Sequence, residues 1–176
     1  TLSPQLSIMN NAKIDNNQKL LKDIKKTLNK ISHDNYNTLY NELLDSLKQY
    51  DDIKILDILS AEFYQKAIYD INFQGIYIDI CYKLWSDLDW QNNLYSVVTQ
   101  EDETNKYYWY LNDNTLEKPV LNGPYKSEND LREQVRKKIN LKVYFLNFIQ
   151  KKFDNRREYI KSSHEDGEND DELRFK

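Results

Sequence analysis

The chain has 176 residues, of which 39% are hydrophobic and 31% charged, and its formal net charge is −4. This composition predicts a polar globular protein large enough for one core or a short stack of repeats. Three glycines and three prolines are too few for a turn-rich sandwich or barrel, and the absence of any run of about 18 apolar residues predicts no membrane span.

The first predicted unit is a pair of helices. Residues 1–18 hold few apolar anchors and are predicted to form a loose lead-in. Residues 19–31 and 34–50 then each carry apolar side chains at three- and four-residue spacing, which is typical of amphipathic helices. Ser32 interrupts them as a candidate N-cap, and so short a turn predicts an antiparallel helical hairpin.

A second pair of helices is predicted over residues 51–69 and 73–88. Asp51 and Asp52 place negative charge at the start of the first of these helices, where the helix dipole favours it. Helical hairpins that recur after roughly 35 residues are typical of an α-solenoid, because one hairpin alone cannot bury its apolar stripe. The sequence therefore predicts an all-α solenoid.

Aromatic segments interrupt the helical pattern. Leu94–Gln100 and Tyr107–Asp113 are rich in residues that favour strands, and a polar turn lies between them. They predict a β-hairpin inserted over residues 89–127. The helical spacing resumes at Glu128 as one bent helix or two, and residues 163–176 are predicted to be an acidic, disordered tail.

No set of residues predicts catalysis. His33 and His164 lack metal-ligand spacing with Cys81 or with each other. Neither a glycine-rich phosphate loop nor a Ser–His–Asp arrangement is present. We therefore expect no enzyme activity, no metal and no cofactor, and the single cysteine favours a reducing, cytoplasmic location.

Four sequence blocks resemble the middle domain of eukaryotic translation initiation factor 4G. The first is Leu28-Asn29-Lys30-Ile31-Ser32, followed by an aromatic at Tyr36; the others are Phe63–Phe73, Ile76–Leu84 and Asn140–Glu158. They occur in the order of that family and cover residues 19–88 and 140–158, about half of the chain.

The use of Lys, Asn, Ile and Tyr is typical of AT-rich coding DNA and favours a protist or viral source.

The resemblance implies a HEAT-type scaffold over residues 19–162 that binds a DEAD-box RNA helicase of the initiation factor 4A type. Carried over from the family, the helicase-binding residues are Leu28, Ile31 and Tyr36; core packing is the alternative for each. The family has five repeats, whereas this chain stops after the third begins, so the contact with the second helicase lobe is missing or lies outside the chain. We expect a monomer.

Two further binding roles are predicted. Basic side chains concentrate near the C-terminal helix and suit RNA phosphates, or else form a solvated helix face: Lys142, Lys151, Lys152, Arg156 and Arg157. The inserted segment is similar to aromatic peptide-binding modules of the GYF type, which implies ligand contacts at Tyr108, Trp109 and Tyr125. The alternative is that these aromatic residues form only the core of the hairpin. The rival functions are a scaffold of mRNA decay or splicing that binds another DEAD-box helicase, and a plain RNA- or peptide-binding module.

Overall fold

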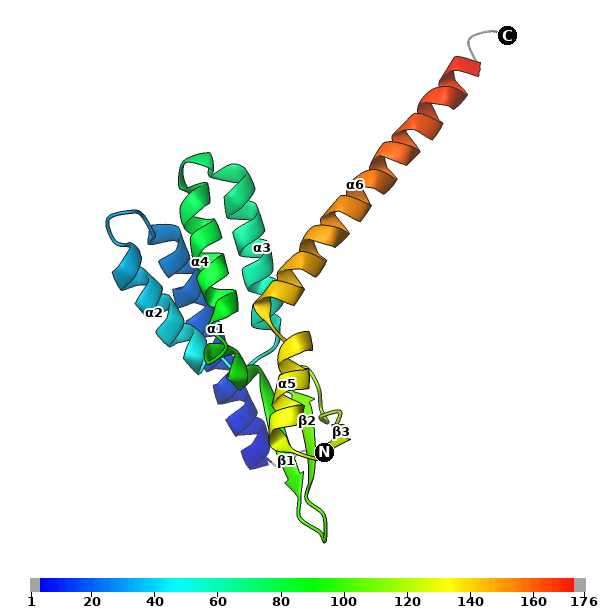
Figure 1. Cartoon of the computed structure of the whole chain (residues 1–176). Helices are drawn as coiled ribbons and strands as arrows, with labels where there is room; N and C mark the ends of the chain where they lie inside the picture. The colour runs from blue at the N-terminus through cyan, green and yellow to red at the C-terminus, as the bar shows by residue number, and fades with distance from the viewer. Residues whose placement is uncertain (1–3, 173–176) are drawn as a thin grey trace.

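The computed structural model describes residues 4–172 and shows, within them, six α-helices and one three-stranded antiparallel sheet (Figure 1). The elements follow the chain as α1 Pro4–Lys30, α2 Tyr36–Gln49, α3 Lys54–Tyr69, α4 Gln74–Ser86, β1 Tyr95–Gln100, β2 Lys106–Leu111, β3 Asn122–Tyr125, α5 Glu128–Lys138 and α6 Leu141–Glu172. Two 3-10 segments, η1 Ile71–Phe73 and η2 Trp90–Leu94, lie between helices and before the sheet.

Helices α1 and α2 form the predicted antiparallel hairpin, but α1 is longer than expected. It begins at Pro4, so residues 4–18 are helical rather than a loose lead-in, and residues 1–3 lie outside the described part. Polar contacts hold this half of the helix. The Asn17 side-chain amide donates to Asp51 at 3.0 Å, and the Lys13 ammonium lies 2.9 Å from the same carboxylate. A count of apolar residues does not detect such anchors.

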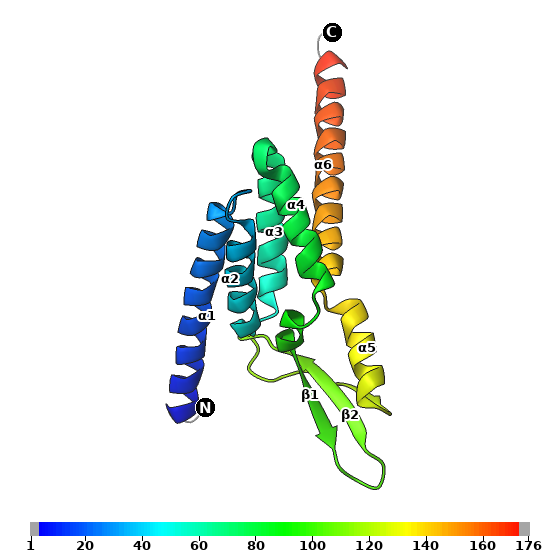
Figure 2. The same cartoon turned by 60° about the vertical axis from the view of Figure 1, so that its left-hand side comes forward.

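Helix α3 is the central helix of the helical body, because both α4 and α6 pack against it. Its buried side chains include Leu56, Leu59 and Phe63. The rings of Tyr64 on α3 and Phe148 on α6 meet edge to face, with centroids 5.4 Å apart. Beyond this contact α6 continues away from the body (Figures 1 and 2).

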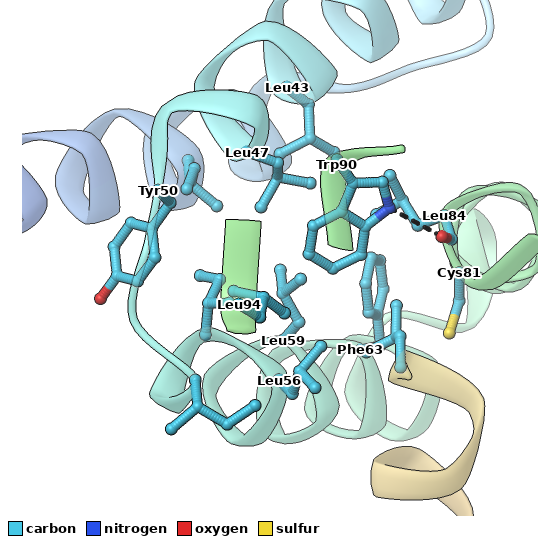
Figure 3. Close-up of a cluster of buried hydrophobic side chains, with 14 of the residues drawn as sticks. Leu43, Leu47, Tyr50, Leu56, Leu59, Phe63, Cys81, Leu84, Trp90 and Leu94 are labelled. Carbon is cyan, nitrogen blue, oxygen red and sulfur yellow. Dashed lines mark hydrogen bonds between the residues drawn. The ribbon is translucent and has the colours of Figure 1, made fainter. Parts of the chain in front are cut away.

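The η2 segment joins the helices to the sheet. Trp90 is fully buried between α2, α3 and α4, and its indole Nε1 donates to the Leu84 carbonyl at 2.8 Å (Figure 3). Gln91 is also buried. Its side-chain nitrogen donates to the Asp87 carbonyl at 2.8 Å, and its side-chain oxygen accepts from the Leu141 amide at 2.8 Å. The Gln91 side chain thereby gives a hydrogen-bond partner to a backbone carbonyl just after α4 and to the backbone amide of the first residue of α6.

The sheet has the order β1-β2-β3, with Val97 opposite Trp109 and Tyr107 opposite Tyr125. Helix α5 packs on one face of it through Leu131 and Val135, which are fully buried. The inserted segment is therefore more than the predicted hairpin. It gains a third strand, and α5 completes a small αβ unit.

The prediction of an all-α HEAT-type solenoid is wrong. The chain does form two helical hairpins, but a sheet with its own helix follows them in place of a third hairpin. Among residues 4–172, α6 has no antiparallel partner helix that follows it. The reason is that the β-prone residues 95–111 pair with each other to form β1 and β2. Helix α5, which was predicted to belong to the helical stack, instead covers the apolar face of this sheet.

The end of the chain differs from the prediction as well. Residues 163–172 continue α6 to Glu172 rather than forming the expected disordered tail, and residues 173–176 lie outside the described part. The local sequence contains only one glycine and no proline, so nothing in it stops a helix already started by the packed segment before it. Of the helices in residues 4–172, none has the length and hydropathy that a bilayer crossing needs.

Candidate protein-interaction surface

The turn between α1 and α2 is closed by Asn35. Its side-chain oxygen accepts from the Ser32 amide at 2.7 Å, and its side-chain nitrogen donates to the Lys30 carbonyl at 2.8 Å. The N-cap residue of α2 is Asn35, whereas the sequence predicted Ser32 for this role. The asparagine therefore fixes both the end of α1 and the position of Tyr36, the first residue of α2.

Tyr36 is the centre of a small cluster that links α2 to α4. Its hydroxyl donates a hydrogen bond to the carboxylate of Asp79, and the ammonium of Lys83 lies 3.6 Å from that carboxylate. Lys83 also lies over two rings, 4.5 Å from the centroid of Tyr36 and 5.5 Å from that of Tyr40. The two tyrosine rings are parallel, with centroids 6.1 Å apart. We call Tyr36, Tyr40, Asp79 and Lys83 the Tyr36 patch.

The electrostatics of this patch keep both tyrosines neutral. Burial, together with the hydrogen bond to Asp79, raises the pKa of Tyr36, and burial raises the pKa of Tyr40. The hydrogen bond with Tyr36 raises the pKa of Lys83. The patch therefore presents an ammonium held over two neutral rings beside a carboxylate, an arrangement in which cation–π and ionic contacts act together.

The Tyr36 patch is accessible and borders a hollow. Asp79 and Lys83 are exposed, and the two tyrosines are half-buried. The adjoining hollow has a volume of about 360 Å³ and lies between the α1–α2 turn and the start of α4, lined by His33, Tyr36, Asn37, Gly75, Ile76 and Asp79. Fixed aromatic and charged side chains around a depression are the features of an interaction surface.

Of the three helicase-binding residues that the resemblance implies, the structure leaves one at the surface. Leu28 is 0% and Ile31 is 3% exposed, so both belong to the core and neither can contact a partner in this fold. Tyr36 is half-buried and packs on the core with one side while its hydroxyl reaches Asp79. The core alternative therefore describes Leu28 and Ile31, and Tyr36 remains a candidate contact.

The five predicted RNA-binding cations are all exposed but do not form one stripe. At about 100° per residue, Lys142, Lys152, Arg156 and Arg157 fall within an arc of about 140° on α6. Lys151 lies on the opposite side, where it borders a hollow with Asp57 of α3. Lys142 lies 6.0 Å from the Trp85 ring, and Lys152 lies 5.3 Å from the Phe148 ring.

The three residues predicted to bind a ligand in the insert do not converge. Trp109 is 7% exposed and faces α5 with Tyr125, whereas Tyr108, one residue along the strand, points to the other face of the sheet. The Nε1 of Trp109 lacks a hydrogen-bond partner within the described residues. Trp109 and Tyr125 therefore act as core residues of the αβ unit.

The sequence did not reveal Tyr40, Asp79 and Lys83 as members of a surface. Asp79 and Lys83 are spaced four residues apart, which in sequence is typical of an ordinary solvated helix pair. Only the packing of the two hairpins shows that this pair meets Tyr36. A metal site has no support in the part of the chain described, where no three His, Cys, Asp or Glu side chains gather.

Comparison with family models, with curated proteins and with solved structures finds no match to this chain. The inference about function therefore depends on the residues themselves and on how the fold arranges them.

Proposed function

We propose that this protein is a non-catalytic adaptor of translation initiation in the cytoplasm. It binds one lobe of a DEAD-box RNA helicase of the initiation factor 4A type through the Tyr36 patch. The four sequence blocks that resemble the initiation factor 4G middle domain support this proposal. They fall on the α1–α2 turn, on α3 with η1, on α4 and on α6. Helix α3 packs against α4 and α6. The hydroxyls of Tyr77 and Tyr36 join α4 to the first hairpin, through the Leu28 carbonyl and the Asp79 carboxylate.

The observation that carries the proposal is the contact of Tyr36 with Asp79 and Lys83. It places an exposed, ordered set of aromatic and charged side chains at the α1–α2 turn, which is the part of the resembled family that binds the helicase. Binding loses little side-chain entropy when the contact groups already hold each other in place. An adaptor that binds one helicase lobe changes the balance between its open and closed forms without performing chemistry.

A pull-down with separately purified helicase lobes tests the proposal. The immobilised protein is expected to retain the C-terminal lobe of an initiation factor 4A type helicase. Tyr36→Ala is expected to weaken retention about tenfold or more, as for an interface hot spot. Tyr69→Ala is the matched control, because Tyr69 is 83% exposed and lies outside the patch.

The same assay separates the rival scaffolds. Retention of a splicing or mRNA-decay helicase lobe, with none of the initiation helicase, would replace the translation role by one of those processes. Failure to retain any lobe, or equal retention by the Tyr36→Ala and Tyr69→Ala variants, contradicts the proposed function. Circular dichroism of both variants confirms that each is folded before the comparison is made.

RNA binding is a second candidate function, supported by the arc of cations on α6. Lys142, Lys152, Arg156 and Arg157 lie there among the exposed apolar side chains Leu146 and Phe153. Phosphate contacts of this kind weaken steeply with salt. An Arg156→Gln, Arg157→Gln variant is expected to lower the salt dependence of binding to single-stranded RNA, and an unchanged slope contradicts this role.

A further inference from the structure

The sheet has one long edge that is open. β1 is the terminal strand of the order β1-β2-β3, and its main neighbours are β2 and η2. Figure 2 shows it on the side of β2 opposite α5. In an antiparallel sheet every second residue of an edge strand directs its amide and carbonyl groups outward, where another strand can pair with them.

The two edges of the sheet differ in how they are protected. β3 has four residues, includes Pro124, which has no amide hydrogen, and contacts α5. β1 has six residues, Tyr95–Gln100, without a charge or a proline. Its second half is exposed, with Val98 39% accessible. Proteins usually protect such an edge with charge, proline or a covering element, so an uncharged, accessible strand is suited to pairing.

An acidic turn adjoins the end of this edge. Glu101, Asp102 and Glu103 follow β1 directly and are all exposed. Asp102 lies 3.8 Å from the ammonium of Lys106 and accepts a hydrogen bond from the Thr104 amide. Glu101 and Glu103 have no cationic partner among the described residues. Two carboxylates are thus left at the end of the open edge.

We propose that β1 binds an extended peptide segment of a partner protein by strand addition. The peptide runs antiparallel to β1 and carries Lys or Arg residues just before an uncharged, β-prone segment. The polarity follows from the geometry: the N-terminal end of an antiparallel peptide lies beside Gln100, next to Glu101 and Glu103. Alternate side chains of the peptide lie over the face formed by Val98 and Tyr108, which are opposite each other in the register.

This site is separate from the Tyr36 patch, so it adds a second partner contact to the proposed adaptor. Its backbone hydrogen bonds supply affinity, and its acidic turn supplies the preference for one peptide direction. The proposal can therefore stand even if no helicase binds the Tyr36 patch.

Two labelled peptides of identical composition test the proposal on the full chain. One has the sequence KRKTVTVTV and the other TVTVTVKRK. Fluorescence anisotropy at low salt is expected to show tighter binding of the first peptide, by about fivefold, because only its cations reach the acidic turn. Hydrogen exchange is expected to slow in residues 95–100 when this peptide is added, while exchange in α1 and α2 stays the same.

Charge-reversal variants separate this contact from a general effect of charge. Glu101→Lys with Glu103→Lys is expected to remove the preference between the two peptides. The control is Glu42→Lys with Glu117→Lys, which changes net charge equally at two other exposed positions and is expected to retain the preference. Equal binding of both peptides by the natural chain, or unchanged exchange in residues 95–100, overturns the proposal. A dimer whose residues 95–100 are already protected also overturns it, because a second copy then occupies the edge.

Discussion

The hydroxyl of Tyr36 donates a hydrogen bond to the carboxylate of Asp79, which lies 43 residues further along the chain. Tyr36 begins the second helix of one hairpin, and Asp79 lies on the second helix of the next. The contact therefore joins the two hairpins at the surface, beside a core that already packs them together. It also orders the aromatic and charged side chains that we propose as the helicase-binding surface.

Removing the Tyr36 hydroxyl tests whether this contact stabilises the fold. Tyr36→Phe keeps the ring over Lys83 and removes only the hydrogen bond to Asp79. We expect the free energy of unfolding to fall by about 0.5–1 kcal/mol, since the contact is exposed and Asp79 keeps Lys83 as a partner. Urea unfolding of both proteins measures this difference. A loss of several kcal/mol would show instead that the ring has lost its packing.

High pH is expected to destabilise the protein through two buried tyrosines and a half-buried one. Burial raises the pKa of Tyr50, Tyr77 and Tyr144 in the folded chain above the ordinary tyrosine value of 10.0. The unfolded chain therefore loses these protons first, so stability is retained below about pH 10 and declines as pH rises further. Denaturant midpoints between pH 8 and 11 measure the decline. Tyr144→Phe is expected to make it shallower, and an equally steep decline in that variant contradicts the assignment.

Gln91 is expected to be among the most sensitive polar residues of the core. Gln91→Met keeps the length of the side chain but leaves the Leu141 amide and the Asp87 carbonyl without their partner. We expect a loss of about 1–3 kcal/mol, because buried polar groups that lose a partner keep their desolvation cost. Urea unfolding, followed by the fluorescence of the buried Trp90, measures the change. A stability equal to that of the natural chain would show that water replaces the glutamine.

Two glycines provide a matched pair for testing the αβ unit. Gly123 has a positive φ of 139°, and a Cβ there would lie 2.8 Å from the Tyr107 carbonyl oxygen, whereas a Cβ at Gly75 meets nothing within 4 Å. Gly123→Ala is expected to cost about 1–3 kcal/mol. Gly75→Ala lies in a helix and is expected to be neutral or to stabilise by up to about 1 kcal/mol. Thermal melts of both variants make the comparison, and the reverse ranking contradicts this description of Gly123 in β3.

The sequence predicted the parts of the fold that follow from local periodicity. The apolar spacing of Leu43 and Leu47 and of Ile80 and Leu84 indicated two helical hairpins, and the aromatic run ending at Leu111 indicated strands. The polar anchors of α1, such as Asn17, carry no periodic signal, and this explains why the first helix was predicted too short. The third strand is only four residues long and contains a proline, so propensity alone could not identify it.

The candidate site was less predictable than the fold. The resemblance implies partner contacts at Leu28 and Ile31, but in this fold both apolar side chains point into the core between the packed helices. Asp79 and Lys83 gave no signal, because their role depends on Tyr36 in another hairpin. The predicted ligand contacts in the insert failed for a similar reason. Successive residues of a strand point to opposite faces of the sheet, so Tyr108 and Trp109 cannot contact the same ligand. Only the position of α5 shows which of the two faces is covered.

The most direct test of the Tyr36 patch is a charge exchange within it, Asp79→Lys together with Lys83→Glu. The exchange retains an ion pair at the same spacing on α4 but reverses the charges that a partner meets. Isothermal titration with the C-terminal lobe of an initiation factor 4A type helicase measures the effect. Our account predicts an affinity lower by about tenfold or more with little change in the thermal melt. An affinity equal to that of the natural chain would contradict it.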